Sequence, residues 1–282
     1  MTAQDVDPHV ARLTVYPVKS LDGLDREVAT VVAGGGLALD RAYALVDDEG
    51  AYVNGKRERA VHRLRSRFDP DGRTLELSAP DGETETFELP GPDADESETE
   101  ALTTFLSDYF GYAVSLRHDA SGGFPDDTTA SGPTVISTAT IEAVASWFPD
   151  ITVDGMRRRL RANIEIGGVP AFWEDHLFAD RDHVVSFSLG DVTLEGVNPC
   201  QRCVVPSRDP DKGEETAGFR EQFVRRREET MPAWSGGDWF DHSFRLMVNT
   251  RPDRGSNGED IAGRSVAVGD PIAVGETRVR TR

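Results

Sequence analysis

Residues 185–206 read VSFSLGDVTLEGVNPCQRCVVP and contain both cysteines of the chain. Apolar and polar residues alternate along the first part of this stretch, which predicts a β-strand with one buried face that leads into the cysteines. Arg202 lies between Cys200 and Cys203, and turn-forming residues follow at 209–213. We therefore expect the chemistry of the protein at the end of this strand, and an anion-binding shell around it.

The cysteine pair is open to four interpretations. A structural zinc site needs four ligands, but the chain has no other cysteine and its histidines lack ligand spacing. A thioredoxin-like motif should open a helix, whereas the following residues 204–206 favour a strand. Two buried, inert cysteines are the third interpretation. The fourth is one reactive thiolate that binds a soft metal, with Arg202 positioning an anionic group.

The charge balance describes an acidic globular protein. Fifty Asp and Glu residues face 31 Lys and Arg residues, the net charge is −19, and only Lys19, Lys56 and Lys212 are lysines. Acidic residues spread along the whole chain are typical of adaptation to high cytoplasmic salt, where charges are screened within about 3 Å at 1 M. An ordinary acidic protein is the alternative. Phosphate contacts need clustered basic residues, so we expect no nucleic-acid partner.

The cellular location and the number of domains can be predicted from hydrophobic runs, the N-terminal sequence and the chain length. No apolar run approaches the length of a transmembrane helix, and the acidic N-terminus resembles neither a signal nor a transit peptide. We therefore expect a cytoplasmic protein with no membrane partner. Two cysteines do not suggest a disulfide framework, and 282 residues leave room for two ordinary domains.

The first part of the chain alternates short strands with turns. Strands are expected at 10–18, 28–32, 40–47, 51–53, 63–68, 74–78 and 84–89. Turns every 8–12 residues predict a small barrel or sandwich. An acidic connector at 91–100 and a helix at 99–110 follow, and the polar loop 115–127 is the expected boundary. We expect one domain at 8–120 and another at 121–282.

The second part carries candidate anion-binding groups. Ser137 and Thr138 open a predicted helix, whose N-terminus suits an anion, although simple capping is the more common reason for such residues at this position. Arg161 and Asn163 fall two residues apart on a predicted strand and therefore on one face; a solvated basic run is the alternative. A charged, exposed helix is expected at 220–230, and closing strands at 246–248 and 266–274.

Five short motifs together resemble a known family. They are VYPVKS at 15–20, LDRAY at 39–43, RANI at 161–164, CQRC at 200–203 and GDP at 269–271. In this order and spacing, the chain resembles the MOSC-domain proteins with an N-terminal β-barrel domain, the family of the amidoxime-reducing components. The resemblance implies a mainly β fold with a few helices (α+β), in which an N-terminal β-barrel-like domain precedes a MOSC β-barrel domain.

The resemblance also implies a cofactor and its ligands. The family binds molybdenum cofactor (Mo-molybdopterin), a pterin dithiolene with a phosphate. Cys203 would be the catalytic thiolate and the protein ligand to molybdenum, and Arg202 would hold the pterin or its phosphate. The remaining cofactor-binding residues implied are Lys19, Ser20, Arg41, Ser137, Thr138, Arg161 and Asn163. Glu174-Asp175 resembles an acidic pair of the family, but His176 follows instead of tryptophan, so we assign the pair no role.

The implied activity is reduction of small N-hydroxylated or related N-oxygenated compounds. The chain ends without the ferredoxin domain that some relatives carry, so we expect a separate electron-donor protein, ferredoxin-like or cytochrome b5-like. One alternative is a sulfur carrier with a persulfide on Cys203. Another is a protein that binds, stores or delivers the cofactor without turnover.

The acidic composition predicts that salt stabilises the fold. Added salt screens the repulsion among the excess carboxylates, so the melting temperature should rise between low ionic strength and molar KCl. Thermal unfolding followed by circular dichroism across a KCl series measures this. A melting temperature that stays flat over the series would contradict halophilic adaptation.

Overall fold

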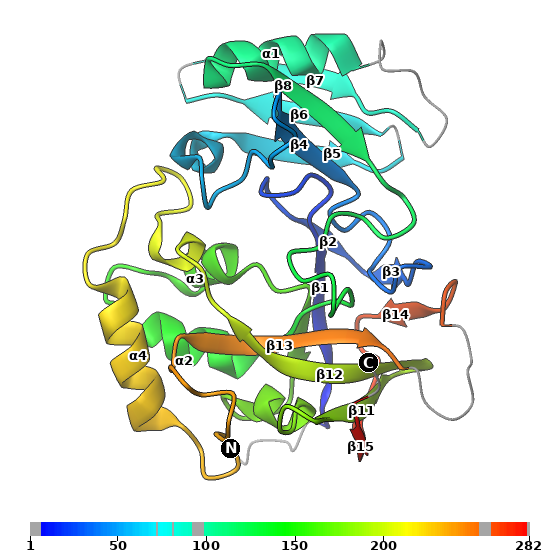
Figure 1. The fold of residues 1–282 in the computed structure, drawn as a ribbon, viewed down its shortest axis with the longest axis vertical. Coiled ribbons are helices and arrows are strands. Elements are labelled where there is room, and N and C mark those ends of the chain that lie inside the picture. Colours follow the sequence, from blue (N-terminus) through cyan, green and yellow to red (C-terminus); the bar gives the residue numbers. More distant parts are fainter. Residues whose placement is uncertain (1–6, 72, 81, 92–98, 254–260, 281–282) are drawn as a thin grey trace, which may run out of the picture.

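The structure is a computed structural model that describes residues 7–71, 73–80, 82–91, 99–253 and 261–280. It contains 34% strand and 21% helix, so the predicted mainly β fold with a few helices is confirmed. Figure 1 shows a smaller upper half and a larger lower half. Among the described residues, no helix has both the length and the apolar composition needed to cross a membrane.

An eight-stranded sheet dominates the lower half (Figure 1). Its strand order is β15 (Ile272–Val279), β11 (His183–Leu189), β12 (Val192–Gln201), β13 (Arg245–Pro252), β9 (Val135–Ser137), β10 (Ile164–Gly167), β1 (His9–Val15) and β2 (Leu24–Arg26). β9 and β10 are parallel, and the other neighbours are antiparallel. The sheet thus joins the first strands of the chain to strands from its second half. The division of the chain into domains at residue 120 remains a prediction.

The strand predicted to lead into the cysteines is confirmed. β11 and β12 form an antiparallel pair in which Phe187 faces Leu194, and both are buried. β12 ends at Gln201, so Cys200 lies on the strand and Cys203 lies just beyond it. The prediction of a strand at 204–206 was wrong, because a short 3₁₀ helix, η4 (Val205–Ser207), lies there. It contains a proline, which has no N–H to donate to a neighbouring strand.

The upper half consists of small antiparallel sheets covered by a helix. Its strands are β4 (Tyr43–Asp47) paired with β8 (Val114–His118), and the meander β5 (Arg65–Asp69), β6 (Thr74–Ser78) and β7 (Thr84–Glu88). The predicted helix is confirmed as α1 (Glu100–Phe110), and it buries Leu102 and Leu106. Most of the connector expected at 91–100 lies outside the described residues.

Two shorter elements complete the first part of the chain. The 3₁₀ helix η1 (Arg59–Arg63) precedes β5, and β3 (Val28–Thr30) pairs with β14 (Ser265–Ala267). The β3–β14 pair is a second link between the beginning and the end of the chain.

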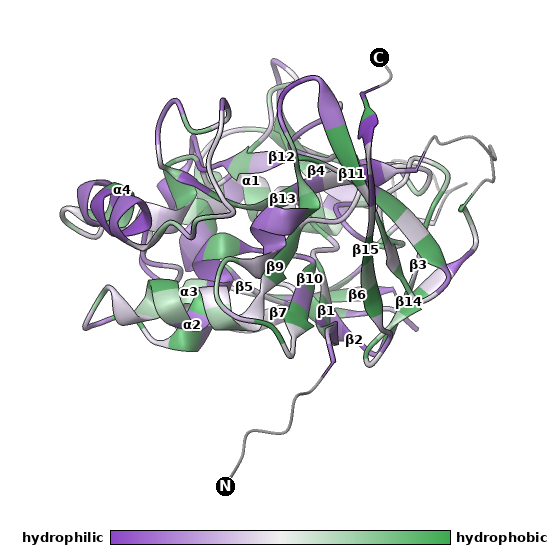
Figure 2. Cartoon of the chain, turned by 90° about the horizontal axis from the view of Figure 1, so that it is seen from below, coloured by the Kyte–Doolittle hydropathy of each residue, from purple (hydrophilic) through white to green (hydrophobic). Residues whose placement is uncertain are grey.

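Three helices pack beside the large sheet. They are α2 (Thr138–Ser146), α3 (Val153–Leu160) and α4 (Phe219–Thr230). Figure 2 shows α4 mostly in the hydrophilic colour. The charged, exposed helix expected at 220–230 is confirmed, since seven of the twelve residues of α4 are exposed, but Phe219, Phe223 and Arg227 recur every four residues and form one buried face.

Arg227 belongs to a buried charged cluster under α4. It pairs with Asp175 of the 3₁₀ helix η3 (Trp173–Leu177), and Glu174 is also completely buried. Glu174 accepts hydrogen bonds from the backbone N–H of Ser137 and the hydroxyl of Thr140, at 3.2 and 2.9 Å. Burial, reinforced by the charge of Asp175, raises the pKa of Glu174 to about 7.

This raised pKa makes stability depend on pH. An unfolded Glu174 loses its proton at lower pH than the folded one, so its stabilising contribution is present below about pH 4.5 and is lost as the pH rises through about 7. Glu174→Gln should therefore flatten the curve of unfolding free energy against pH between 5 and 8, by on the order of 2 kcal/mol.

Urea unfolding at several pH values measures the effect. Glu142 is exposed and lies on α2, the helix whose first residues bond to Glu174. Glu142→Gln is therefore the control and should leave the slope of unfolding free energy against pH unchanged. A Glu174→Gln curve that parallels that of the wild type would contradict the prediction.

Candidate functional site

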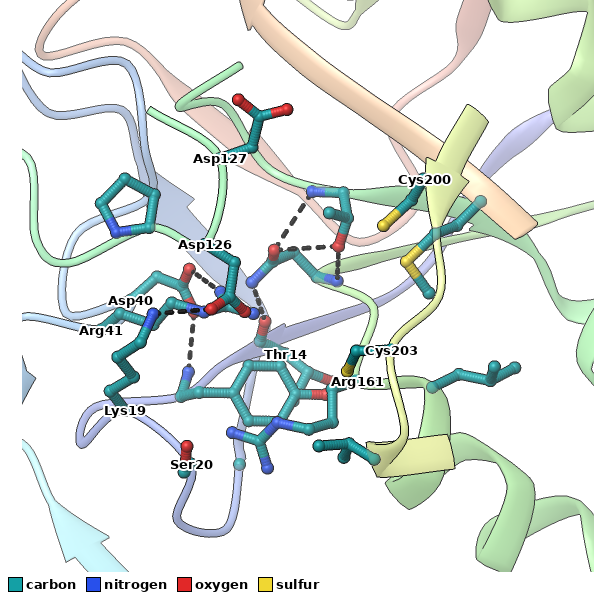
Figure 3. Close-up of a pocket in the computed structure, with 18 of the residues that line it drawn as sticks. Thr14, Lys19, Ser20, Asp40, Arg41, Asp126, Asp127, Arg161, Cys200 and Cys203 are labelled. Atoms are coloured by element: carbon teal, nitrogen blue, oxygen red, sulfur yellow. Dashed lines mark hydrogen bonds and ion pairs between the residues drawn. The ribbon is translucent and has the colours of Figure 1, made fainter. Parts of the chain in front are cut away.

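A cavity of about 960 Å³ is lined by residues from both halves of the molecule. Figure 3 shows Lys19, Arg41 and Asp126 on one side and the two cysteines on the other. The predicted site residues that line the cavity are Lys19, Ser20, Arg41, Arg161, Asn163, Arg202 and Cys203.

Two predicted residues do not line the cavity. Ser137 is fully buried, and its hydroxyl oxygen accepts a hydrogen bond from the N–H of Thr140 as the N-cap of α2. Thr138 lies beside it, with its hydroxyl 3.5 Å from Glu165. The structure therefore gives the hydroxyl-rich helix start its capping role and places it apart from the other predicted residues.

The cavity is cationic although the chain is acidic. Thirteen of its lining residues are Lys or Arg and five are Asp, whereas the chain as a whole has a net charge of −19. Such a concentration of positive charge in a cleft favours an anionic ligand.

Tyr16, just beyond β1, contacts two of these cations. The guanidinium of Arg161 lies 4.0 Å from the centre of its ring, and that of Arg41 lies 5.3 Å away. Its hydroxyl donates to the carbonyl oxygen of Ala162 at 3.2 Å. Burial raises the pKa of Tyr16 to about 12, although both arginines oppose the shift, so the ring stays neutral and presents its π face to the cations.

The spacing of Arg161 and Asn163 had predicted that both lie on a strand. For Arg161 this prediction was wrong. Arg161 is the C-cap of α3 in the left-handed conformation, with φ at 57°, and β10 begins only at Ile164. Asn163 lines the cavity, but its side chain is engaged in the sheet. It donates to the carbonyl oxygen of Thr14 and accepts from the N–H and hydroxyl of Thr134, at 3.0 to 3.1 Å.

Lys19 is almost completely buried and has two partners. Its ammonium donates to the carbonyl oxygen of Phe124 and to the carboxylate of Asp126, each at 2.8 Å. Burial lowers the pKa of Lys19, and the charge of Asp126 opposes this. Burial acts to raise the pKa of Asp126, but Lys19 and Arg41 outweigh it and hold that pKa below its usual range. Asp126 is therefore ionised at neutral pH and serves as the acceptor for the Lys19 ammonium.

Backbone strain gathers at this cavity. Seven described residues other than glycine have positive φ, and four of them line the cavity: Ser20, Arg41, Arg161 and Met247. Each such conformation costs of order 1–3 kcal/mol in an ordinary residue and persists only when the surrounding structure enforces it. The unusual backbone conformations at these four residues therefore coincide with side chains that line the same cavity.

The cysteines are free and only partly buried. In the described residues, no three His, Cys, Asp or Glu side chains are grouped so as to hold a metal among themselves. Arg202 donates to Cys200 Sγ at 3.5 Å, to Met247 Sδ at 3.1 Å and to the carbonyl oxygen of Leu160 at 2.9 Å. The region around the thiols therefore combines sulfur atoms with a fixed guanidinium.

Several buried donors around the cavity have no hydrogen-bond partner among the described residues. They are Nη2 of Arg161 and the Nε atoms of Arg65, Arg159, Arg202, Arg208 and Arg245. A buried polar group without a partner costs about 1–3 kcal/mol, more when it is charged. These orphaned donors are an independent sign that the cavity suits an anion.

Comparison with known proteins gives the family. Residues 7–113 match the model of the MOSC N-terminal beta barrel domain, and residues 132–273 match that of the MOSC domain. The chain belongs to the MOSC-domain proteins. It is also 26% identical over 295 residues to mitochondrial amidoxime-reducing component 1 of Homo sapiens, across 93% of this chain and 82% of the human protein. The resemblance drawn from the five motifs is confirmed.

Sequence reasoning missed several residues of this MOSC-domain cavity. Tyr16 stands inside a quoted motif, and its place before the rare Lys19 could have drawn attention to it. Asp126 carries no signal, since it is one carboxylate among fifty acidic residues. Met247 lies on the strand predicted at 246–248 and Arg245 directly before it, and the strand pattern gave no reason to separate them from the core.

Proposed function

We propose that this chain is a cytoplasmic molybdenum-cofactor reductase of small N-hydroxylated or related N-oxygenated compounds. The observation that carries the proposal is the position of Cys203, a soft thiol at the edge of a strongly cationic cavity. A soft metal prefers thiolate ligands, and a phosphate-bearing pterin prefers arginine and lysine. The human relative is by name an amidoxime-reducing component, which supports this substrate class.

The residues present fit such a cofactor. Cys203 supplies one soft ligand position, and the unpaired donors of Arg161 and Arg208 could bond to pterin or phosphate oxygens. Lys19 and Arg41 bring positive charge from the opposite wall, with Asp126 and Asp40 as their counter-ions. Ser20 offers a hydroxyl beside them.

The roles of these residues follow from their chemistry. The bound cofactor would supply the two-electron redox chemistry that removes oxygen from substrate. Reduction of an N–OH group to N–H consumes two electrons and two protons and releases water, so an electron donor is required, and we propose a protein of the ferredoxin or cytochrome b5 kind for this role. The chain's own contribution is to bind, orient and electrostatically stabilise the cofactor. Cys203 could instead carry a persulfide, or the chain could deliver cofactor, and the turnover measurement below separates reduction from delivery or storage.

Replacing the proposed metal ligand tests the function directly. Cys203→Ser should still bind the pterin but lose most reductase activity, because a hydroxyl is a harder and poorer ligand for this centre. Cys200→Ser should have a milder effect. Turnover of benzamidoxime with reduced methyl viologen, together with molybdenum content, measures both variants. Equal activity of Cys203→Ser and wild type would overturn the assignment, and cofactor without any turnover in wild type would favour delivery or storage.

Replacing cations of the cradle tests cofactor binding. Arg161→Ala and Lys19→Ala should each weaken cofactor binding by about ten- to a hundredfold, since a charge-assisted hydrogen bond contributes roughly 1.5–3 kcal/mol. Occupancy is measured as molybdenum and pterin per chain, with the melting temperature as a check on folding. Arg226→Ala on the exposed side of α4 removes the same charge outside the cavity and should keep occupancy unchanged. Wild-type occupancy in the Lys19 variant would exclude Lys19 from cofactor binding.

A further inference from the structure

Arg202 has more protein partners than a ligand-binding arginine needs. One terminal nitrogen, Nη1, donates to Met247 Sδ at 3.1 Å and to Cys200 Sγ at 3.5 Å. The other, Nη2, donates to the carbonyl oxygen of Leu160 at 2.9 Å. Both ends of the guanidinium are thus engaged by the protein, and only Nε is left without a partner.

These partners come from three separate segments. Cys200 lies on β12, Met247 lies on β13, and Leu160 is the last residue of α3. The residue after Leu160 is Arg161, whose left-handed backbone turns its side chain into the cavity. Arg202 therefore connects the segment that carries Cys203 to the helix end that carries Arg161. A cation at a helix C-terminus also satisfies a carbonyl that the helix leaves free.

The two sulfur atoms are placed by a local distortion of β13. Pairing between β12 and β13 shifts register between Pro199 and Gln201, and Met247 lies in the corresponding bulge with φ at 65°. A bulge re-aims a side chain, and a non-glycine residue with positive φ is strained. Met247 is nevertheless buried and holds its sulfur against Arg202. Sulfur is a weak hydrogen-bond acceptor, and this contact alone would not offset the backbone strain at Met247. The surrounding fold therefore holds the Met247 sulfur atom in this position.

We propose that Cys200 and Met247 are positioning residues whose sulfur atoms hold the Arg202 guanidinium against the end of α3, and so fix Cys203 relative to Arg161. Arg202 then acts as a clamp between ligand-bearing segments, with both of its terminal nitrogens engaged by the protein. The importance of the clamp for turnover rests on the proposed function, but its existence does not. This gives Cys200 the role of a hydrogen-bond acceptor, with no part in thiol chemistry.

If Cys200 acts by accepting a hydrogen bond from Arg202, two replacements of Cys200 should differ in their effect. A serine hydroxyl also accepts a hydrogen bond from Arg202, whereas an alanine does not. Cys200→Ser should therefore keep the clamp better than Cys200→Ala. If Cys200 acted as a nucleophile or a persulfide carrier, serine and alanine would be equally damaging.

Hydrogen exchange in the purified protein measures the clamp without reference to activity. Cys200→Ala and Met247→Leu should each raise exchange of the backbone amides at 200–204 by about two- to tenfold, as expected for loss of one modest hydrogen bond. The amide of Arg202 is the sensitive reporter, because it donates to the carbonyl oxygen of Phe244 at 3.0 Å. Met156→Leu, the same substitution at a fully buried methionine of α3, should leave this segment unchanged.

A double-mutant cycle shows whether the sulfur atoms act through Arg202. In an Arg202→Met background, adding Met247→Leu should have no further effect on exchange at 200–204. Molybdenum content and benzamidoxime turnover are measured in the same set, with reduced methyl viologen as donor. Met247→Leu should lower kcat by about two- to tenfold with molybdenum content retained.

Any of these results would overturn the clamp: unchanged exchange in both single variants, equal damage by serine and alanine at position 200, or full additivity of Met247→Leu in the Arg202→Met background. Loss of molybdenum from Met247→Leu to the same extent as from Arg161→Ala would also overturn it, since Arg202 would then belong to the cofactor cradle. A wild-type protein that holds cofactor but does not reduce benzamidoxime would contradict the proposed function alone, because exchange still tests the clamp.

Discussion

The antiparallel pairing of β1 with β10 is the interaction on which the site depends. It places Leu13 opposite Ile164 and so brings the segment that continues to Tyr16 and Lys19 beside the turn that carries Arg161. The side chain of Asn163, directly before β10, bonds to Thr14 of β1 and to Thr134, which directly precedes β9. Without this pairing, the cations of the two halves would lie on separate surfaces and no shared cavity would exist.

The second constraint is the burial of positive charge in an acidic chain. Moving cations out of water costs free energy unless nearby anions or dipoles compensate. Asp40 and Asp126 provide part of this compensation beside Arg41 and Lys19. The remaining unpaired donors leave the cavity electrostatically incomplete, which is the state expected of a preorganised anion site. The acidic outer surface and the cationic interior are therefore two parts of one charge distribution.

The sequence predicted features that depend on local pattern. Alternating apolar residues gave the strand leading into Cys200, and helical spacing gave α1. The hydroxyls at 137–138 misled, because helix capping and anion binding share one local signal. The left-handed backbone of Arg161 and the bulge at Met247 were beyond prediction, since pairing with distant strands imposes them. The convergence of Lys19 with Cys203 was available only through family resemblance.

The insertion of the earliest strands into a sheet built from later ones has a consequence for biosynthesis. A ribosome releases β1 long before β10, and β3 long before its partner β14 near the other end of the chain. Until those partners emerge, the apolar face of β1 that carries Val10 and Leu13 has nothing to cover it. Pairings this distant in sequence form slowly. The nascent chain therefore passes through a long interval in which chaperones have an exposed strand to protect.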